Sequence, residues 1–211
     1  AMMPSTCSPE AGSTFFRYGQ DFARDTMKKA RNLYKKLVLD ADDIGAGNPM
    51  AYNELFALAF VAHYIVSGKR IAPEIVQEMM RRSLYRVKFY FSMVDLNTPQ
   101  GKLSNQKSIL KYVKWYTPER ERRYPNSFKV DFVGKPYEEA CYYRITRCPI
   151  CAYCKRLGVE ELMPLLCELD KVMIGLQHGV LHREQTIASG GGCCDYFIMG
   201  DREQLKPEDK N

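Results

Sequence analysis

The 211-residue sequence lacks a long unbroken apolar run, a cluster of basic residues and an N-terminal export signal. Its longest apolar stretch, Leu55 to Val66, is interrupted by His63. It falls short of the roughly 20 residues that a membrane-spanning helix needs. Residues 1–20 show neither the basic start nor the apolar segment of a secretory signal. We therefore expect no membrane partner, and we expect a cytoplasmic protein.

The charge balance is only mildly basic, with 31 Lys and Arg against 25 Asp and Glu. The basic residues are spread over several segments, so we expect most of them to lie on solvated faces. This pattern gives little support to nucleic-acid binding, and we expect no nucleic-acid partner. A hydrophobic fraction of 45% and a charged fraction of 27% are typical of a soluble globular protein.

The first half of the chain has the apolar periodicity of helices, and the second half alternates as strands do. We expect an α+β fold, in which a helical N-terminal half packs on a small antiparallel sheet with short helices. We expect one domain over 1–211, with a helical region at 19–118, an α+β region at 126–200, and tails at 1–17 and 201–211. The predicted helices are Phe22–Leu37, Met50–Val66, Pro73–Phe91, Asn105–Trp115, Pro149–Leu157 and Glu160–Ile174.

The predicted strands lie in the second half. Phe128–Phe132 and Cys141–Ile145 each alternate apolar and polar residues. Leu181–Ala188 and Cys194–Met199 flank a glycine-rich segment, which predicts a β-hairpin with a flexible loop.

Cysteine is unevenly distributed, because seven of the eight lie in the last third of the chain. Cys148, Cys151 and Cys154 have C-x2-C-x2-C spacing, which iron–sulfur proteins use to bring thiolates to one cluster. Adding Cys167 would complete a tetrahedral zinc site. The simpler alternative is that Cys151 and Cys154 merely line a helix. In a cytosolic protein, clustered thiols indicate metal binding or catalysis more than disulfides.

Cys148 is the strongest candidate for a reactive thiol. It precedes Pro149, and proline favours the first helical position, so Cys148 is predicted to be the N-cap. The helix N-terminus, with Arg144 and Arg147 nearby, predicts a lowered thiol pKa and a reactivity above that of Cys151 and Cys154. The alternative is a buried, inert thiol at a strand–helix junction.

Two further groups complete the candidate site. Cys167 and Asp170 are three residues apart, on the flank of a predicted helix, where a carboxylate could act as acid or base or could form a rim salt bridge. Ligand-binding candidates from the hairpin are Arg183, Thr186, Gly190, Gly191, Cys194 and Asp195. The glycines there would let the backbone approach a ligand closely.

These residues form two blocks that resemble a known family. The first block is Cys148-Pro149, Leu157-Gly158, Glu161-Leu162, Pro164, Leu166-Cys167 and Asp170. The second is Arg183, Thr186-Ile187-Ala188, Gly190-Gly191 and Cys194-Asp195-Tyr196. Across residues 128–197 the chain is similar to the L-2-amino-thiazoline-4-carboxylic acid hydrolase family. Cys151, Cys154 and Cys193 are additional to that pattern.

The resemblance implies hydrolysis of a small cyclic amidine. Water adds to the carbon between nitrogen and sulfur, and the ring opens to N-carbamoyl-L-cysteine. Cys148 would be the nucleophile or a metal ligand, with Cys167 beside it. Asp170 or Asp195 would act as acid or base, and Arg183 would hold a substrate carboxylate. The alternative is a non-catalytic module that binds a metal or a small ligand through Cys148, Cys151, Cys154 and Cys167.

Overall fold

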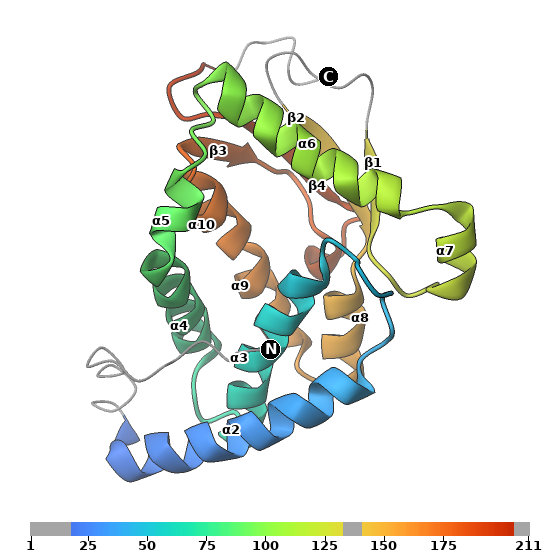
Figure 1. Cartoon of the computed structure of the whole chain (residues 1–211). Coiled ribbons are helices and arrows are strands. Elements are labelled where there is room, and N and C mark those ends of the chain that lie inside the picture. Colours follow the sequence, from blue (N-terminus) through green and yellow to red (C-terminus); the bar gives the residue numbers. More distant parts are fainter. Residues whose placement is uncertain (1–17, 133–140, 205–211) are drawn as a thin grey trace.

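The computed structural model describes residues 18–132 and 141–204. Helices form one end of the molecule, and a four-stranded antiparallel sheet forms the other, so the α+β prediction is confirmed (Figure 1). The helices are α2 Gln20–Asp40, α3 Ala51–Val66, α4 Pro73–Arg86, α5 Lys88–Ser92, α6 Pro99–Trp115, α7 Pro118–Arg123, α8 Pro149–Arg156, α9 Met163–Cys167 and α10 Leu169–Gly175. The 3₁₀ helices are η2 Glu160–Leu162 and η3 Ile187–Ser189, and the strands are β1 Lys129–Phe132, β2 Cys141–Arg147, β3 Gly179–His182 and β4 Cys194–Gly200.

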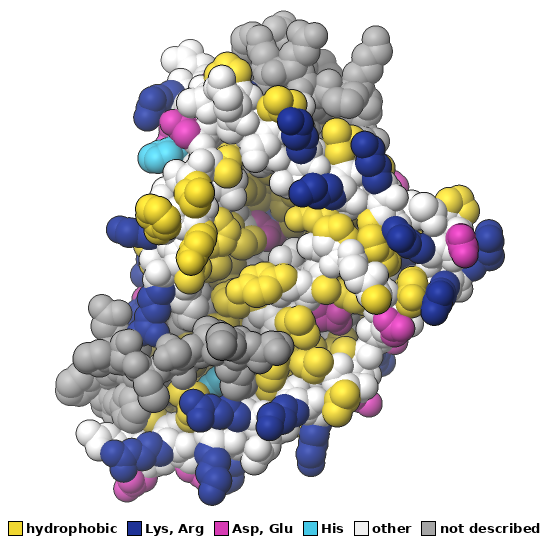
Figure 2. Space-filling view, in the orientation of Figure 1, with side chains coloured by type: hydrophobic (Ala, Val, Ile, Leu, Met, Phe, Trp, Pro, Cys, Tyr) yellow, Lys and Arg dark blue, Asp and Glu magenta, His cyan; other side chains and the backbone are white. Residues whose placement is uncertain are grey.

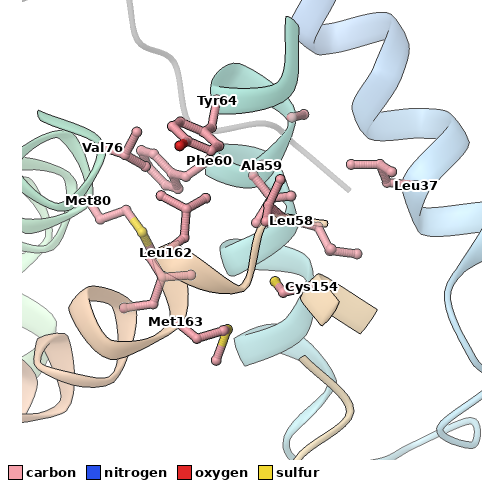
Figure 3. Close-up of a cluster of buried hydrophobic side chains, with 14 of the residues drawn as sticks. Leu37, Leu58, Ala59, Phe60, Tyr64, Val76, Met80, Cys154, Leu162 and Met163 are labelled. Atoms are coloured by element: carbon pink, nitrogen blue, oxygen red, sulfur yellow. The ribbon is translucent and has the colours of Figure 1, made fainter. Parts of the chain in front are cut away.

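The helical end is built around α3, whose central residues are buried on several faces because the helix is apolar all round. The amphipathic α2 lies against it and buries one stripe that includes Ala30 and Leu37. Helices α4, α8 and α9 complete this helical core, which Figure 3 shows in close-up. Most of the buried apolar surface of this half is therefore provided by helix–helix contacts.

The sheet has the strand order β1-β2-β4-β3, and every neighbouring pair is antiparallel. Alternate residues of β2 and β4 face the same side, and Tyr143 pairs in register with Tyr196. Helix α6 crosses this side of the sheet, and α10 packs against β3 (Figure 1). The side chains on this face form a second core, here called the sheet core, with the buried members Cys141, Tyr143, Ile145, Cys194, Tyr196 and Ile198.

The predicted helices are present, with three differences in their bounds. The third helix is divided at Val87, which ends α4 and precedes α5. The fourth begins at Pro99 rather than Asn105, because the Thr98 side chain accepts the Gly101 N–H and caps it. The segment Glu160–Ile174 is three short helices, since Pro164 donates no backbone hydrogen bond and Glu168 separates α9 from α10.

The predicted hairpin is wrong in its first arm. Strand β3 is Gly179–His182, and the chain between β3 and β4 turns into η3 rather than extending to Ala188. The cause is local, because Thr186 caps η3 through the Ser189 N–H, and Gly190 ends it in the left-handed conformation at φ 87°. The predicted tail at 1–17 lies outside the described residues. Among the described helices, none combines the length and apolar character needed to cross a membrane.

Candidate functional site

A buried ion pair joins α10 to the end of β3. The Arg183 guanidinium donates to Asp170 Oδ2 at 2.8 Å, and its side chain is only 2% exposed. The Tyr196 hydroxyl, from β4, donates to the same oxygen at 2.7 Å. Among the described residues Asp170 Oδ1 accepts no hydrogen bond, and the Asp170 side chain is 23% exposed. Asp170 is therefore held by two donors on one oxygen, while the other oxygen has no hydrogen-bond partner among the described residues.

Thiols surround this carboxylate. Cys167, at the end of α9, lies near enough to Cys148, at the start of α8, to raise the pKa of the Cys148 thiol. The charges of Asp170 and Cys194 raise the pKa of Cys167. The pKa of Cys194 is lowered by Arg183 and raised by Asp170. The structure thus brings together four residues predicted from distant parts of the sequence, namely Cys148, Cys167, Asp170 and Arg183, and adds Cys194.

The predicted low pKa of Cys148 is wrong. Cys148 is the N-cap of α8, as expected, and Pro149 is the first helical residue. Burial nevertheless raises the pKa of the Cys148 thiol, outweighing a nearby backbone N–H from Cys151 that opposes the rise. The two arginines do not reach the thiol: Arg144 is bonded to Tyr142, and Arg147 is bonded to Ser127 O and Tyr116.

The other site thiols are likewise neutral. Burial, with the negative charge of Asp170, raises the pKa of Cys167 to about 12. Burial also raises the pKa of Cys194, whose Sγ accepts the Ile187 N–H at 3.3 Å. At neutral pH these side chains are thiols, which are weak donors and poor nucleophiles.

The pKa of Asp170 is also raised above its usual value. Burial is the largest cause, while the hydrogen bond from Tyr196 and the charge of Arg183 oppose it. A carboxyl with a raised pKa can exchange a proton with substrate at neutral pH more readily than an ordinary aspartate.

Arg183 is not available to hold a substrate carboxylate. Its Nη1 is bonded to Asp170, and its Nη2 is bonded to Cys167 O at 2.7 Å and to Glu168 Oε1 at 3.3 Å. The planar fork that would grip a ligand is instead used to fix α9 and α10 beside β4. The predicted role of Arg183 as a substrate clamp is therefore corrected to a role in positioning Asp170.

Asp195 lies on the other face of β4 from Cys194 and Tyr196, so it does not join Asp170. Its two carboxylate oxygens accept the backbone N–H groups of Glu184 and Gln185, at 2.9 and 2.8 Å. These bonds hold the turn after β3. We therefore replace the predicted acid–base role of Asp195 with a structural one.

The predicted ligand-binding glycines and Thr186 shape their own loop. Gly191 N–H donates to Thr186 O at 2.9 Å, and a Cβ on Gly191 would come within 2.7 Å of the Gln185 side chain. The Thr186 hydroxyl is bonded to Ser189. The loop folds against α9, so its contribution is to place Cys194 and Arg183.

The predicted metal site of Cys148, Cys151, Cys154 and Cys167 finds no support. Cys154 is fully buried in the helical core among α3 and α8 side chains (Figure 3). Within residues 18–132 and 141–204, no three His, Cys, Asp or Glu side chains are arranged to hold a metal ion. Cys154 therefore packs as a small apolar side chain, and burial raises its pKa to about 12.

One face of the molecule is hollowed. Figure 2 shows the molecule recessed between the α6 side and the α5–α10 side, with mostly hydrophobic walls and an acidic side chain at depth. Cys148, Cys151 and Cys167 are half-buried. A separate small pocket lies between α6 and the end of β4, lined in part by Asn105 and Met199.

Sequence reasoning missed the two tyrosines of this site. Tyr143 and Tyr196 are cross-strand neighbours whose rings stack at 4.6 Å between centroids. The alternation of β2 and β4 could have placed them on the face of Cys141 and Cys194. The alternation could not predict that Asp170 lies next to Tyr196, because this contact depends on how α10 packs against β3.

A family comparison covers this whole arrangement. The model of the L-2-amino-thiazoline-4-carboxylic acid hydrolase family matches residues 52–198, which is more than half of the chain and includes much of the helical half. No curated protein and no solved structure gave a significant match. The chain therefore belongs to the L-2-amino-thiazoline-4-carboxylic acid hydrolase family.

Proposed function

We propose that the protein is a hydrolase that opens a small cyclic amidine, such as 2-amino-thiazoline-4-carboxylate, to N-carbamoyl-cysteine. The observation that carries the proposal is Asp170, a half-buried carboxylate with one oxygen held by Arg183 and Tyr196 and the other free among the described residues. Membership of the family supports the substrate class.

Asp170 is assigned the proton transfers. Its Oδ1 takes a proton from a water molecule as the water oxygen bonds to the carbon between the ring nitrogen and sulfur. The carbon–sulfur bond then breaks as the carbonyl forms. One of the two protons of the water ends on the ring nitrogen and the other on the departing sulfur, so one water is consumed and one thiol is released. The raised pKa of Asp170 supports its uptake of the proton in the first step.

The thiols are assigned to the walls of the site and not to attack on the substrate. Cys148 and Cys167 are neutral because burial raises their pKa values. A neutral thiol is a poor nucleophile, and no described residue stands as a base for Cys148. This assignment replaces the thiolate mechanism that the sequence alone favoured.

The test is release of a thiol from 2-amino-thiazoline-4-carboxylate, followed with a colorimetric thiol reagent against an enzyme blank. Asp170→Asn keeps the shape and removes the proton acceptor, so we expect kcat/KM to fall roughly 100- to 10,000-fold. The matched control is Asp131→Asn on β1, because Asp131 is exposed and, among the described residues, its side chain accepts a hydrogen bond only from Thr146.

Two outcomes would count against the proposal. A folded wild type that releases no thiol would reject this reaction. Equal turnover by the wild type and Asp170→Asn would reject Asp170 as the acid–base group.

A further inference from the structure

Tyr143 is a rigid part of the site. Its side chain is 7% exposed, and its ring is nearly parallel to that of Tyr196, with an interplanar angle of 11°. The Arg183 guanidinium lies 5.5 Å from the centre of the Tyr196 ring. Arg183, Tyr196 and Tyr143 therefore form an ordered row, and the Tyr143 ring has little freedom to turn.

The Tyr143 hydroxyl has no hydrogen-bond partner among residues 18–132 and 141–204, whereas its neighbour Tyr196 is bonded to Asp170. Buried tyrosine hydroxyls usually find a partner. Among the described residues, the side-chain atoms that are fully shielded and lack a partner belong to Glu54, His63, Asn105 and Trp115, and not to Tyr143. The Tyr143 oxygen therefore keeps contact with open space, although the rest of the side chain is packed.

The groups around this hydroxyl show that it lies close to Asp170. Burial raises the pKa of Tyr143 well above its usual value, and the charges of Asp170, Cys141 and Tyr112 add to the rise, while Arg183 opposes it. Tyr143 therefore stays protonated, and it lies near the carboxylate that the proposed reaction uses. A phenol O–H is also a stronger donor than the neighbouring thiols.

We propose that Tyr143 is a further substrate-contacting residue, whose hydroxyl donates a hydrogen bond to the ring sulfur of the cyclic amidine as the carbon–sulfur bond breaks. The inference rests on the proposed function. Negative charge grows on the sulfur during this step, and a fixed donor stabilises it without reorganisation. Tyr143 remains protonated throughout, so Asp170 alone exchanges protons with the substrate.

The test compares Tyr143→Phe with Tyr142→Phe. Both substitutions remove one hydroxyl from β2, but Tyr142 lies on the opposite face, against Phe197. A contact that strengthens during bond breaking affects kcat more than KM. We expect Tyr143→Phe to lower kcat roughly 10- to 100-fold with a smaller change in KM. We expect Tyr142→Phe to match the wild type, and thermal unfolding checks that both variants are folded.

Calorimetric titration with the same compound separates this inference from the proposed function. If the wild type binds but does not turn over the compound, the proposed reaction fails, and at least several-fold weaker binding by Tyr143→Phe alone would still support the contact. If the wild type is active, an equal kcat for Tyr143→Phe would overturn the role of Tyr143. If the wild type only binds the compound, equally tight binding by Tyr143→Phe would overturn it. A wild type that neither binds nor reacts would overturn both. If Tyr143→Phe does not fold, a tyrosine ultraviolet difference spectrum of the wild type decides, and an unchanged spectrum at saturating ligand overturns the contact.

Discussion

The helical core and the sheet-side site take cysteines from the same short motif but give them different surroundings. Cys154 is 0% exposed and packs with α3, whereas Cys148 and Cys151 are half-buried. Cys151 packs partly against the helical core beside Cys154, whereas Cys148, the extended N-cap residue, packs against the sheet core. Regular cysteine spacing therefore does not by itself place thiols around one ligand.

The same two regions treat a buried carboxylate differently. Asp170 is bonded to Arg183 and Tyr196. Glu54, on α3, is 5% exposed, and its Oε1 is shielded without a hydrogen-bond partner among the described residues. Burial, with the charge of Asp42, raises the pKa of Glu54 to about 7 although Arg156 opposes the rise. Two hydrogen-bond donors hold the Asp170 carboxylate, whereas Glu54 lies in the helical core with a raised pKa.

The most direct test of this difference is to replace Glu54, the buried acid of the helical core, by glutamine. Between its usual pKa of 4.5 and the raised value of about 7, Glu54 holds its proton in the folded state and loses it in the unfolded state. The free energy of unfolding should therefore fall by about 3 kcal/mol as pH rises through this window, and stay level above it. Glu54→Gln should abolish this fall and be the more stable protein at pH 8.

The measurement is urea unfolding of both proteins from pH 4 to pH 8. The difference between the two curves is the relevant quantity, because the acids with lowered pKa values, such as Glu78 and Glu161, are common to both. A difference that does not change with pH would show that Glu54 is ionised normally in the folded protein.

We expect smaller changes in stability when Cys154 or Cys148 is replaced by serine, and we expect them to differ. Cys154→Ser puts a hydroxyl into an apolar core and should lower the free energy of unfolding by about 1–3 kcal/mol. Cys148→Ser, at a half-buried helix start, should cost less than about 1 kcal/mol, since serine is a good N-cap. Turnover should survive in Cys148→Ser within a few-fold, because the proposed chemistry uses Asp170.

Thermal unfolding and thiol release on the two serine variants check this pair of expectations. At this chain length, 1 kcal/mol corresponds to roughly 2–4 °C in Tm. Loss of turnover in a folded Cys148→Ser variant would show that the reaction depends on the Cys148 thiol. Equal Tm values for the two variants would remove the distinction between core and site.

Much of the fold could be predicted from periodicity, because each element carries its own signal. The spacing in α2 and α3 and the alternation in β2 depend only on which residues are apolar. The hairpin prediction failed because Thr186 and Gly190 form η3 and because the Asp195 carboxylate holds the backbone N–H groups of Glu184 and Gln185. Periodicity describes neither of these interactions.

The site was partly predictable, since Cys148, Cys167, Asp170 and Arg183 were chosen for their chemistry and do lie together. Their roles were not predictable, because a role depends on burial and partners. The N-cap position of Cys148 predicted a lowered thiol pKa, whereas burial raises it. Arg183 looked free until the structure showed its fork bonded to Asp170 and Cys167.

A crystal structure of the Asp170→Asn variant with bound 2-amino-thiazoline-4-carboxylate tests the central claim most directly. The account predicts the ring carbon between nitrogen and sulfur facing position 170, with a water molecule between them at about 3 Å from the side chain. It also predicts the ring sulfur on the side of the Tyr143 hydroxyl. A ligand bonded covalently to Cys148 or Cys167, or bound away from residue 170, would contradict it.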